Sequence, residues 1–162
     1  MNYFELYQIP PAFQIDRQLL TRRYLELQKQ YHPDYFTQAS PQEQAEVLEK
    51  SSAINQAYRI FTNPHQTIKY LLTLKGLLEE EEKYTLPPDF LMEVMELNEA
   101  KMEGASQQEI ASKVEQLMQQ IKQPVANILA NYQEGQTTEA QLLQVKQYYF
   151  QKNYLDRLLA NQ

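Results

Sequence analysis

The residues best suited to chemistry in this chain are His32 and Asp34, which flank Pro33 in the tripeptide His32-Pro33-Asp34. A histidine beside an aspartate could act as a general acid–base pair. The nearest nucleophile candidates, Thr37 and Ser40, belong to no nucleophile motif, and no glycine-rich loop could form an oxyanion or phosphate site. The tripeptide therefore does not predict an enzyme.

A metal site has no better support in the sequence. His32 and His65 are the only histidines, and there is no cysteine. A thiolate zinc site, a cysteine-ligated iron–sulfur cluster and a disulfide framework are therefore excluded. We expect no metal and no cofactor, and the absence of cysteine is typical of a cytoplasmic protein.

Composition narrows the class of protein further. The chain has 162 residues, is 43% hydrophobic and contains only 3 glycines, which favours one ordinary domain or two small ones made of helices. No apolar run approaches the roughly 20 residues that span a bilayer, and residues 1–5 do not resemble a signal peptide, so we expect no membrane partner.

Charge is divided unevenly between the two halves of the chain. Residues 1–75 hold 8 Lys and Arg against 7 Asp and Glu, whereas residues 76–162 hold 7 Lys and Arg against 14 Asp and Glu. The acidic second half argues against nucleic acid as a partner.

Apolar and aromatic residues repeat at helical spacings on both sides of the tripeptide. They are Leu20, Tyr24, Leu27 and Tyr31 upstream, and Val47, Ile54, Tyr58 and Phe61 downstream. Pro33 lacks an amide hydrogen and disfavours helical backbone at His32, so the upstream helix should end there. Asp34 could accept hydrogen bonds from nearby backbone amides. We therefore expect the tripeptide on a short loop between two paired helices, where it could also be no more than a helix-ending turn.

Capping residues and breaks predict an all-α fold with two domains. Helices are expected over 3–7, 17–31, 41–62 and 64–75, and then over 88–103, 107–132 and from 139 to the C-terminus. Pro124 should kink the long helix over 107–132. Four consecutive glutamates and a Pro-Pro pair mark a change in composition after Gly76. We predict an N-terminal domain over 1–75, a linker over 76–86, and an antiparallel three-helix bundle over 87–162.

Basic residues follow one face of the helix that leads into the tripeptide. Arg22 and Lys29 are seven residues apart, Arg23 lies beside them, and Glu26 should partly offset their charge. Such a stripe is most often an ordinary solvated face, but it could also dock an acidic partner.

Residues 1 to about 75 resemble the J-domain of J-protein co-chaperones. The resemblance rests on Tyr3-Phe4-Glu5-Leu6-Tyr7, His32-Pro33-Asp34 and Ile54-Asn55-Gln56-Ala57-Tyr58. It implies that His32, Pro33 and Asp34, assisted by Arg22, Arg23 and Lys29, bind an ATP-dependent chaperone of the HscA/DnaK class. Many J-domains have a basic residue where this chain has Gln30, which hints at a specialised chaperone partner.

The second half resembles HscB, the J-type co-chaperone of iron–sulfur cluster assembly. It lacks the glycine/phenylalanine-rich and cysteine-rich segments of generic J-proteins and contains Phe90-Leu91-Met92-Glu93 after the linker. The resemblance implies a co-chaperone, not an enzyme, that delivers an IscU-type scaffold protein to the chaperone and stimulates its ATPase. A J-protein adaptor for a different client and a structural helical protein remain the alternatives.

The helix over 88–103 carries two stripes of residues. Phe90, Val94 and Leu97 form the stripe better suited to the core. The other stripe, expected about a third of a turn away, could be part of a wide core face or an exposed binding surface. The resemblance to HscB implies that this stripe, with one aromatic from the last helix, binds the scaffold. The scaffold-binding residues are thus predicted to be Leu91, Met92, Met95, Glu96, Glu99, Glu103 and Phe150.

Overall fold

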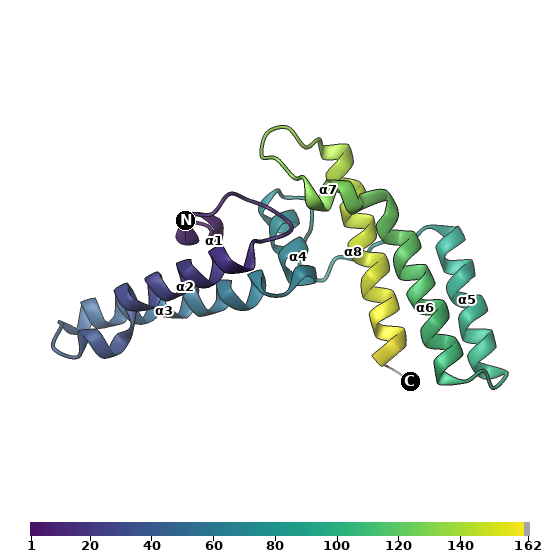
Figure 1. The fold of residues 1–162 in the computed structure, drawn as a ribbon, viewed down its shortest axis with the longest axis horizontal. Coiled ribbons are helices and arrows are strands. Elements are labelled where there is room, and N and C mark those ends of the chain that lie inside the picture. Colours follow the sequence, from purple (N-terminus) through teal and green to yellow (C-terminus); the bar gives the residue numbers. More distant parts are fainter. Residues whose placement is uncertain (161–162) are drawn as a thin grey trace. The chain divides into compact units, whose positions relative to one another are not determined.

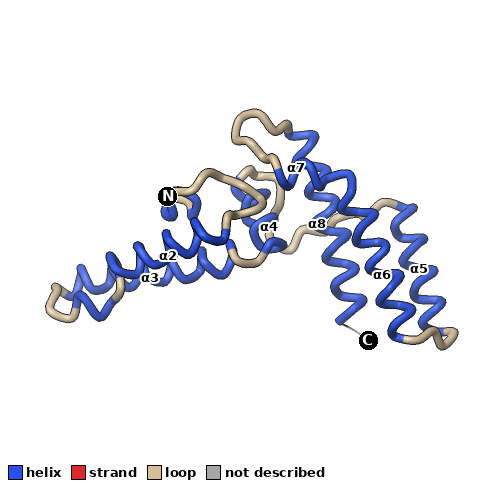
Figure 2. Tube along the Cα trace, in the orientation of Figure 1, coloured by secondary structure: helices blue, strands red, loops and turns tan. Residues whose placement is uncertain are grey.

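The computed structural model describes residues 1–160, which form helices joined by turns and loops, with no strand in that range (Figure 2). The prediction of an all-α fold is confirmed. The chain divides into two compact units. The first contains Met1–Leu71 and Tyr132–Glu134, and the second contains Leu72–Asn131 and Gly135–Gln162. Residues 161 and 162, the end of the expected bundle, lie outside the described residues.

The first unit is built around a helical hairpin. Its elements are α1 (Tyr3–Tyr7), α2 (Arg17–Tyr31), the 3₁₀ turn η1 (Pro33–Phe36), α3 (Pro41–Phe61) and the start of α4 (Pro64–Leu74). Figure 1 shows α2 and α3 side by side, with η1 and the loop after it joining them at one end. The predicted helix limits agree with these bounds to within one residue.

Side-chain caps explain where these helices begin. The Asp16 carboxylate accepts hydrogen bonds from the amides of Gln18 and Leu19, at 2.9 and 3.2 Å, so α2 starts directly after it. The Ser40 hydroxyl accepts from the Glu43 amide at 3.2 Å and begins α3 in the same way.

Aromatic rings hold α1 against the end of α3. Phe4 lies 4.9 Å from Phe61 between ring centroids, and the edge of Tyr7 meets the same ring at 5.6 Å. The buried Tyr7 hydroxyl donates a 2.7 Å hydrogen bond to the Ile54 carbonyl. Burial raises the pKa of Tyr7 far above its ordinary value, so this hydroxyl stays protonated and keeps donating. The base of the hairpin is therefore rigidly packed.

The second unit contains a helical bundle. Its helices are α5 (Pro88–Met102), α6 (Gln107–Lys122), α7 (Ala126–Ala130) and α8 (Glu139–Ala160), with the 3₁₀ turn η2 (Gln123–Val125) between α6 and α7. One face of each long helix is apolar and meets in a common core. That core consists of Phe90, Val94, Leu97, Ile110, Val114, Leu117 and Leu155.

One expectation about this unit changes. Pro124 does more than kink a continuous helix, because α6 ends at Lys122 and the chain passes through η2 before α7 begins. A proline inside a helix loses one amide donor and crowds the preceding turn, which accounts for the break. Residues 76–86, the expected linker, are grouped with the second unit, and the side chain of Leu78 within them is only 5% exposed.

Candidate interaction sites

The tripeptide His32-Pro33-Asp34 lies at the tip of the α2–α3 hairpin. His32 has extended backbone angles, φ −68° and ψ 129°, which end α2 as Pro33 predicted. Pro33 then begins η1, and the turn is fastened to α3 by Gln44. The Gln44 amide nitrogen donates to the carbonyls of Phe36 and Thr37, at 3.0 and 3.1 Å. The turn is thus an ordered structure that presents the tripeptide in one conformation.

His32, more than Asp34, caps this turn. The amide of Asp34 donates to Nδ1 of the His32 ring at 3.2 Å, so Nδ1 is unprotonated in this contact. The neutral ring then carries its proton on Nε2, which remains available as a donor to a partner. The Asp34 side chain was expected to accept amide hydrogen bonds, but it is 85% exposed and lies 3.6 Å from the same Nδ1. The carboxylate is therefore open to a partner.

Tyr35 was missed by sequence reasoning. Its ring is 69% exposed and meets the His32 ring edge-on, with 6.0 Å between centroids. A shallow pocket of about 330 Å³ opens beside the same turn, lined in part by Pro33, Phe36 and Leu48. No periodic signal could have identified Tyr35, because it lies in the turn.

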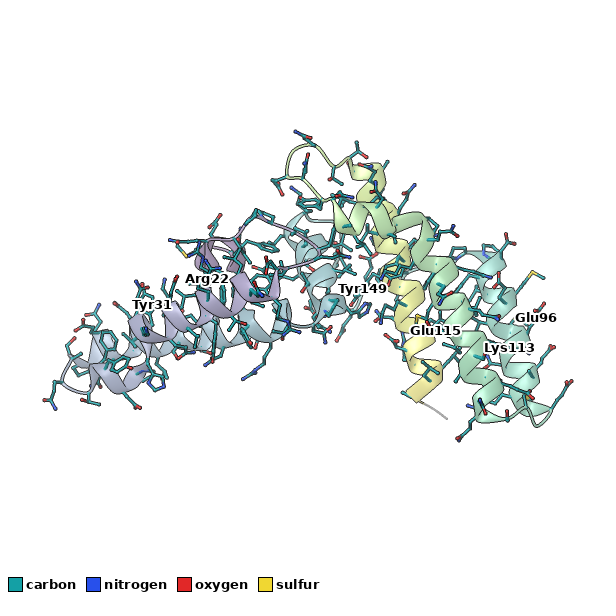
Figure 3. All side chains as sticks on the ribbon, viewed as in Figure 1. Arg22, Tyr31, Glu96, Lys113, Glu115 and Tyr149 are labelled. Carbon is teal, nitrogen blue, oxygen red and sulfur yellow. The ribbon has the colours of Figure 1, made fainter. Side chains whose placement is uncertain are left out.

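The three basic residues of α2 that were predicted to bind a chaperone differ in availability. Arg23 is half-buried and forms an ion pair with Glu26 at 3.3 Å, the offset expected from the sequence. Arg22, labelled in Figure 3, and Lys29 are exposed and form no ion pair within residues 1–160. The cationic face is therefore provided by Arg22 and Lys29, seven residues apart on one side of the helix.

The two stripes of α5 are clearly separated. Phe90, Val94 and Leu97 are at most 5% exposed. On the other stripe Met92 and Met95 are 61% and 60% exposed. At 3.6 residues per turn the stripes lie about half a turn apart, more than the third of a turn expected, so only one of them can face the core.

The exposed stripe of α5 carries both apolar and acidic groups. Leu91 is 36% exposed, and the glutamates Glu96, Glu99 and Glu103 are exposed beside the methionines (Figure 3 labels Glu96). Met102, which was not predicted, belongs to the same stripe and is 87% exposed. It follows Met95 by seven residues, so helical spacing could have found it. The stripe forms an adaptable apolar surface with an acidic border.

Phe150 lies on another helix, α8, and is half-buried. Its ring stacks on Tyr84, with 4.5 Å between centroids and 3° between planes. Tyr84 is four residues before α5 begins at Pro88. Phe150 is thus joined to the segment that leads into α5.

Groups of side chains suited to metal chemistry are not found in the part of the chain that the structure describes, where no three His, Cys, Asp or Glu residues come together to hold an ion. Within the same residues, no helix is long and apolar enough to cross a membrane.

Comparison with known proteins identifies the C-terminal region first. Residues 86–161 match the family described as the HSCB C-terminal oligomerisation domain. Among solved structures, human co-chaperone protein HscB has a TM-score of 0.79 and 27% identity, with 99% of this chain and 80% of the human chain covered. Chaperone HscB from Vibrio cholerae has a TM-score of 0.63 and 30% identity, with 99% of both chains covered.

Curated sequences agree with these structures. A co-chaperone protein HscB homolog from Vibrio vulnificus is 44% identical over 100 residues, which make up 61% of this chain and 58% of that relative. The corresponding homolog from Shewanella halifaxensis is 39% identical over 124 residues, 76% of this chain and 71% of the relative. The alignment to the Vibrio relative thus spans a little over half of its length. The identity, the coverage and the shared fold together show that this chain belongs to the HscB co-chaperone family.

Proposed function

We propose that this protein is a co-chaperone of iron–sulfur cluster assembly. It holds an IscU-type scaffold protein with its second unit and engages an HscA/DnaK-class chaperone with its first, stimulating the chaperone's ATPase. The observation that carries this proposal is the exposed, ordered His32-Pro33-Asp34 turn in a chain that belongs to the HscB family. The protein itself performs no reaction in this proposal, and it works in the cytoplasm.

The chaperone-binding surface combines the turn with the cationic face of α2. The Nε2 donor of His32 and the exposed Asp34 carboxylate provide directional polar contacts. Arg22 and Lys29 provide unpaired positive charge that attracts an acidic surface and speeds encounter. Arg23 contributes less, because its charge is already shared with Glu26.

The scaffold-binding surface is the exposed stripe of α5 together with Phe150. Leu91, Met92 and Met95 supply apolar area that a partner can bury, and flexible methionines adapt to its shape. Glu96, Glu99 and Glu103 select a partner with basic residues around an apolar centre. This surface therefore fits a folded protein with a basic-rimmed apolar patch.

The first test measures the ATPase rate of an HscA-class chaperone with the full chain. His32→Gln and Asp34→Asn should abolish stimulation while leaving the thermal midpoint nearly unchanged, since both side chains are exposed. Gln38→Ala, exposed in the same connection, is the matched control and should stimulate normally. Full stimulation by His32→Gln contradicts the chaperone-binding role.

The second test measures binding of a purified IscU-type scaffold by calorimetry. Glu96→Lys should weaken binding, whereas Glu115→Lys makes the same charge change on α6 and should not (Figure 3 labels both residues). A chain that stimulates the ATPase but does not bind this scaffold would be an adaptor for a different client. A chain that does neither would be a structural helical protein.

A further inference from the structure

Residues 77–86, which lie between α4 and α5, have one buried apolar residue and make two side-chain contacts with α8. The buried residue is Leu78. The acidic residue Glu82 forms an ion pair with Lys146 of α8, with 2.6 Å between Oε2 and Nζ. The aromatic residue Tyr84 stacks on Phe150. We call residues 77–86 the strap.

A small turn gives the strap its shape. The Glu82 amide donates to the Glu79 carbonyl at 3.3 Å, and the Glu79 amide donates to the Glu82 carboxylate at 3.1 Å. Glu81 within this turn has a φ of +55°, a left-handed conformation that is uncommon outside glycine. Such a conformation persists where its surroundings hold it in place. The Glu82 carboxylate thus closes the turn and ties it to Lys146.

Lys146 contacts both Glu82 and Tyr84 of the strap. Its ammonium pairs with Glu82 and also lies 5.8 Å from the centre of the Tyr84 ring. Both side chains of the pair are mostly buried, at 16% and 19% exposure, so the pair is less screened than a surface one. The ion pair therefore holds Tyr84 over α8 at the level of Phe150.

The Phe150 ring is consequently held from two directions. The Tyr84 ring lies parallel to one of its faces, and the edge of Tyr149 meets it at 5.2 Å and 82°. Offset-stacked and edge-to-face arrangements are the favoured ones for aromatic pairs. Phe150 remains partly exposed, so the strap orients its ring without covering it completely.

We propose that Tyr84 is a positioning residue for scaffold binding, which fixes the Phe150 ring in its binding orientation through the stack that the Glu82–Lys146 pair supports. This inference rests on the proposed scaffold-binding role of Phe150. Immobilising a free side chain on binding costs about 0.5–1.5 kcal/mol. A ring that is already fixed avoids that cost, so loss of the stack should weaken binding by about 2- to 12-fold.

The experiment is a double-mutant cycle in the full chain, read as the Kd for a purified IscU-type scaffold. Tyr84→Ala should weaken binding by the amount above, and Phe150→Ala should weaken it more. Tyr84→Phe keeps the stacked ring and should restore binding close to that of the unaltered chain. Tyr84→Ala combined with Phe150→Ala should bind no more weakly than Phe150→Ala alone, because Tyr84 acts through Phe150. An unfolding curve for each variant gives the fraction folded, by which the affinities are corrected.

The outcomes separate this inference from the function on which it rests. Absence of binding by the unaltered chain, or an unchanged Kd for Phe150→Ala, overturns the scaffold-binding role of Phe150 and this inference with it. Normal binding by Tyr84→Ala, with weakened binding by Phe150→Ala, overturns the positioning role alone. Tighter binding by Tyr84→Ala also overturns it, since the strap would then be a cover that the scaffold must displace. Additive losses of binding free energy in the double variant would likewise overturn the positioning role, because they would show that Tyr84 contacts the scaffold independently of Phe150.

Discussion

Replacing Met92 and Met95 together by alanine tests the binding face of α5 most directly. Full burial of such a side chain is worth about 1.5–3 kcal/mol, and about 60% of each is still exposed in the free protein. A partner that covers them therefore gains about 1–2 kcal/mol from each, and the double variant should lose about 2–4 kcal/mol of binding free energy. This corresponds to roughly 30- to 700-fold in the Kd of the IscU-type scaffold.

The same variant should scarcely affect folding. Both methionines are exposed, and alanine is at least as good a helix former, so the free energy of unfolding should change by less than about 0.5 kcal/mol. Leu97→Ala is the matched control on the opposite side of α5. Leu97 is 5% exposed, so its truncation should cost the fold about 2–5 kcal/mol. The measurements are the Kd for the scaffold by calorimetry and the free energy of unfolding in urea, each for both variants. An unchanged Kd for the double variant, or a loss of stability matching that of Leu97→Ala, would refute the reasoning.

Three further predictions concern charge and backbone conformation. Chaperone binding should weaken as salt rises, because exposed charges are screened over about 10 Å at 0.1 M. Arg22→Glu with Lys29→Glu should flatten that salt dependence, whereas Arg59→Glu on α3 should not. The Lys146 hydrogen bond lowers the pKa of Glu82 below its ordinary value, so this pair stabilises the fold above that value and the stabilisation is lost as pH falls through the lowered pKa. Between pH 7 and pH 3, the thermal midpoint of Glu82→Gln should therefore fall less steeply than that of the unaltered chain. Identical pH profiles for the two chains would contradict this. Gly76 has a φ of +75° and its added Cβ would meet no atom within 4 Å, so Gly76→Ala should cost about 1–2 kcal/mol from conformation alone. Gly76→Asn should cost less, and equal unfolding curves for all three chains would contradict the conformational origin.

The limits of the helices were predictable because their signals are local. Asp16, Ser40 and Ser106 each accept an amide hydrogen bond from the first turn of the helix that follows them, a contact that residues of these types make at helix starts. Gly76 closes α4, with the Leu77 amide bonded to the Leu72 carbonyl at 3.0 Å. These contacts join residues a few positions apart, so composition and spacing are enough to specify them.

The candidate sites were predictable only in part. His32, Pro33 and Asp34 could be placed on a turn from the conformational limits of proline, and the methionine stripe of α5 could be placed on one helix face by its period. The capping role of the His32 ring was not predictable, because it depends on the angles that the turn adopts. The depth of the break at Pro124 was equally undetermined, since a kink and a full interruption satisfy the same local rule.

Tertiary packing decided which stripe of α5 is buried and what holds Phe150. Periodicity showed that Phe90, Val94 and Leu97 share a face, but their burial depends on Ile110, Val114 and Leu155 from other helices. The stack of Tyr84 on Phe150 likewise joins residues far apart in the chain. Local sequence determines the conformation of each helix, whereas contacts between distant residues form only when the whole unit closes around its apolar core. The helices and the turn at Pro33 were therefore predictable from local sequence, whereas the contacts of the strap with Phe150 form only in the folded protein.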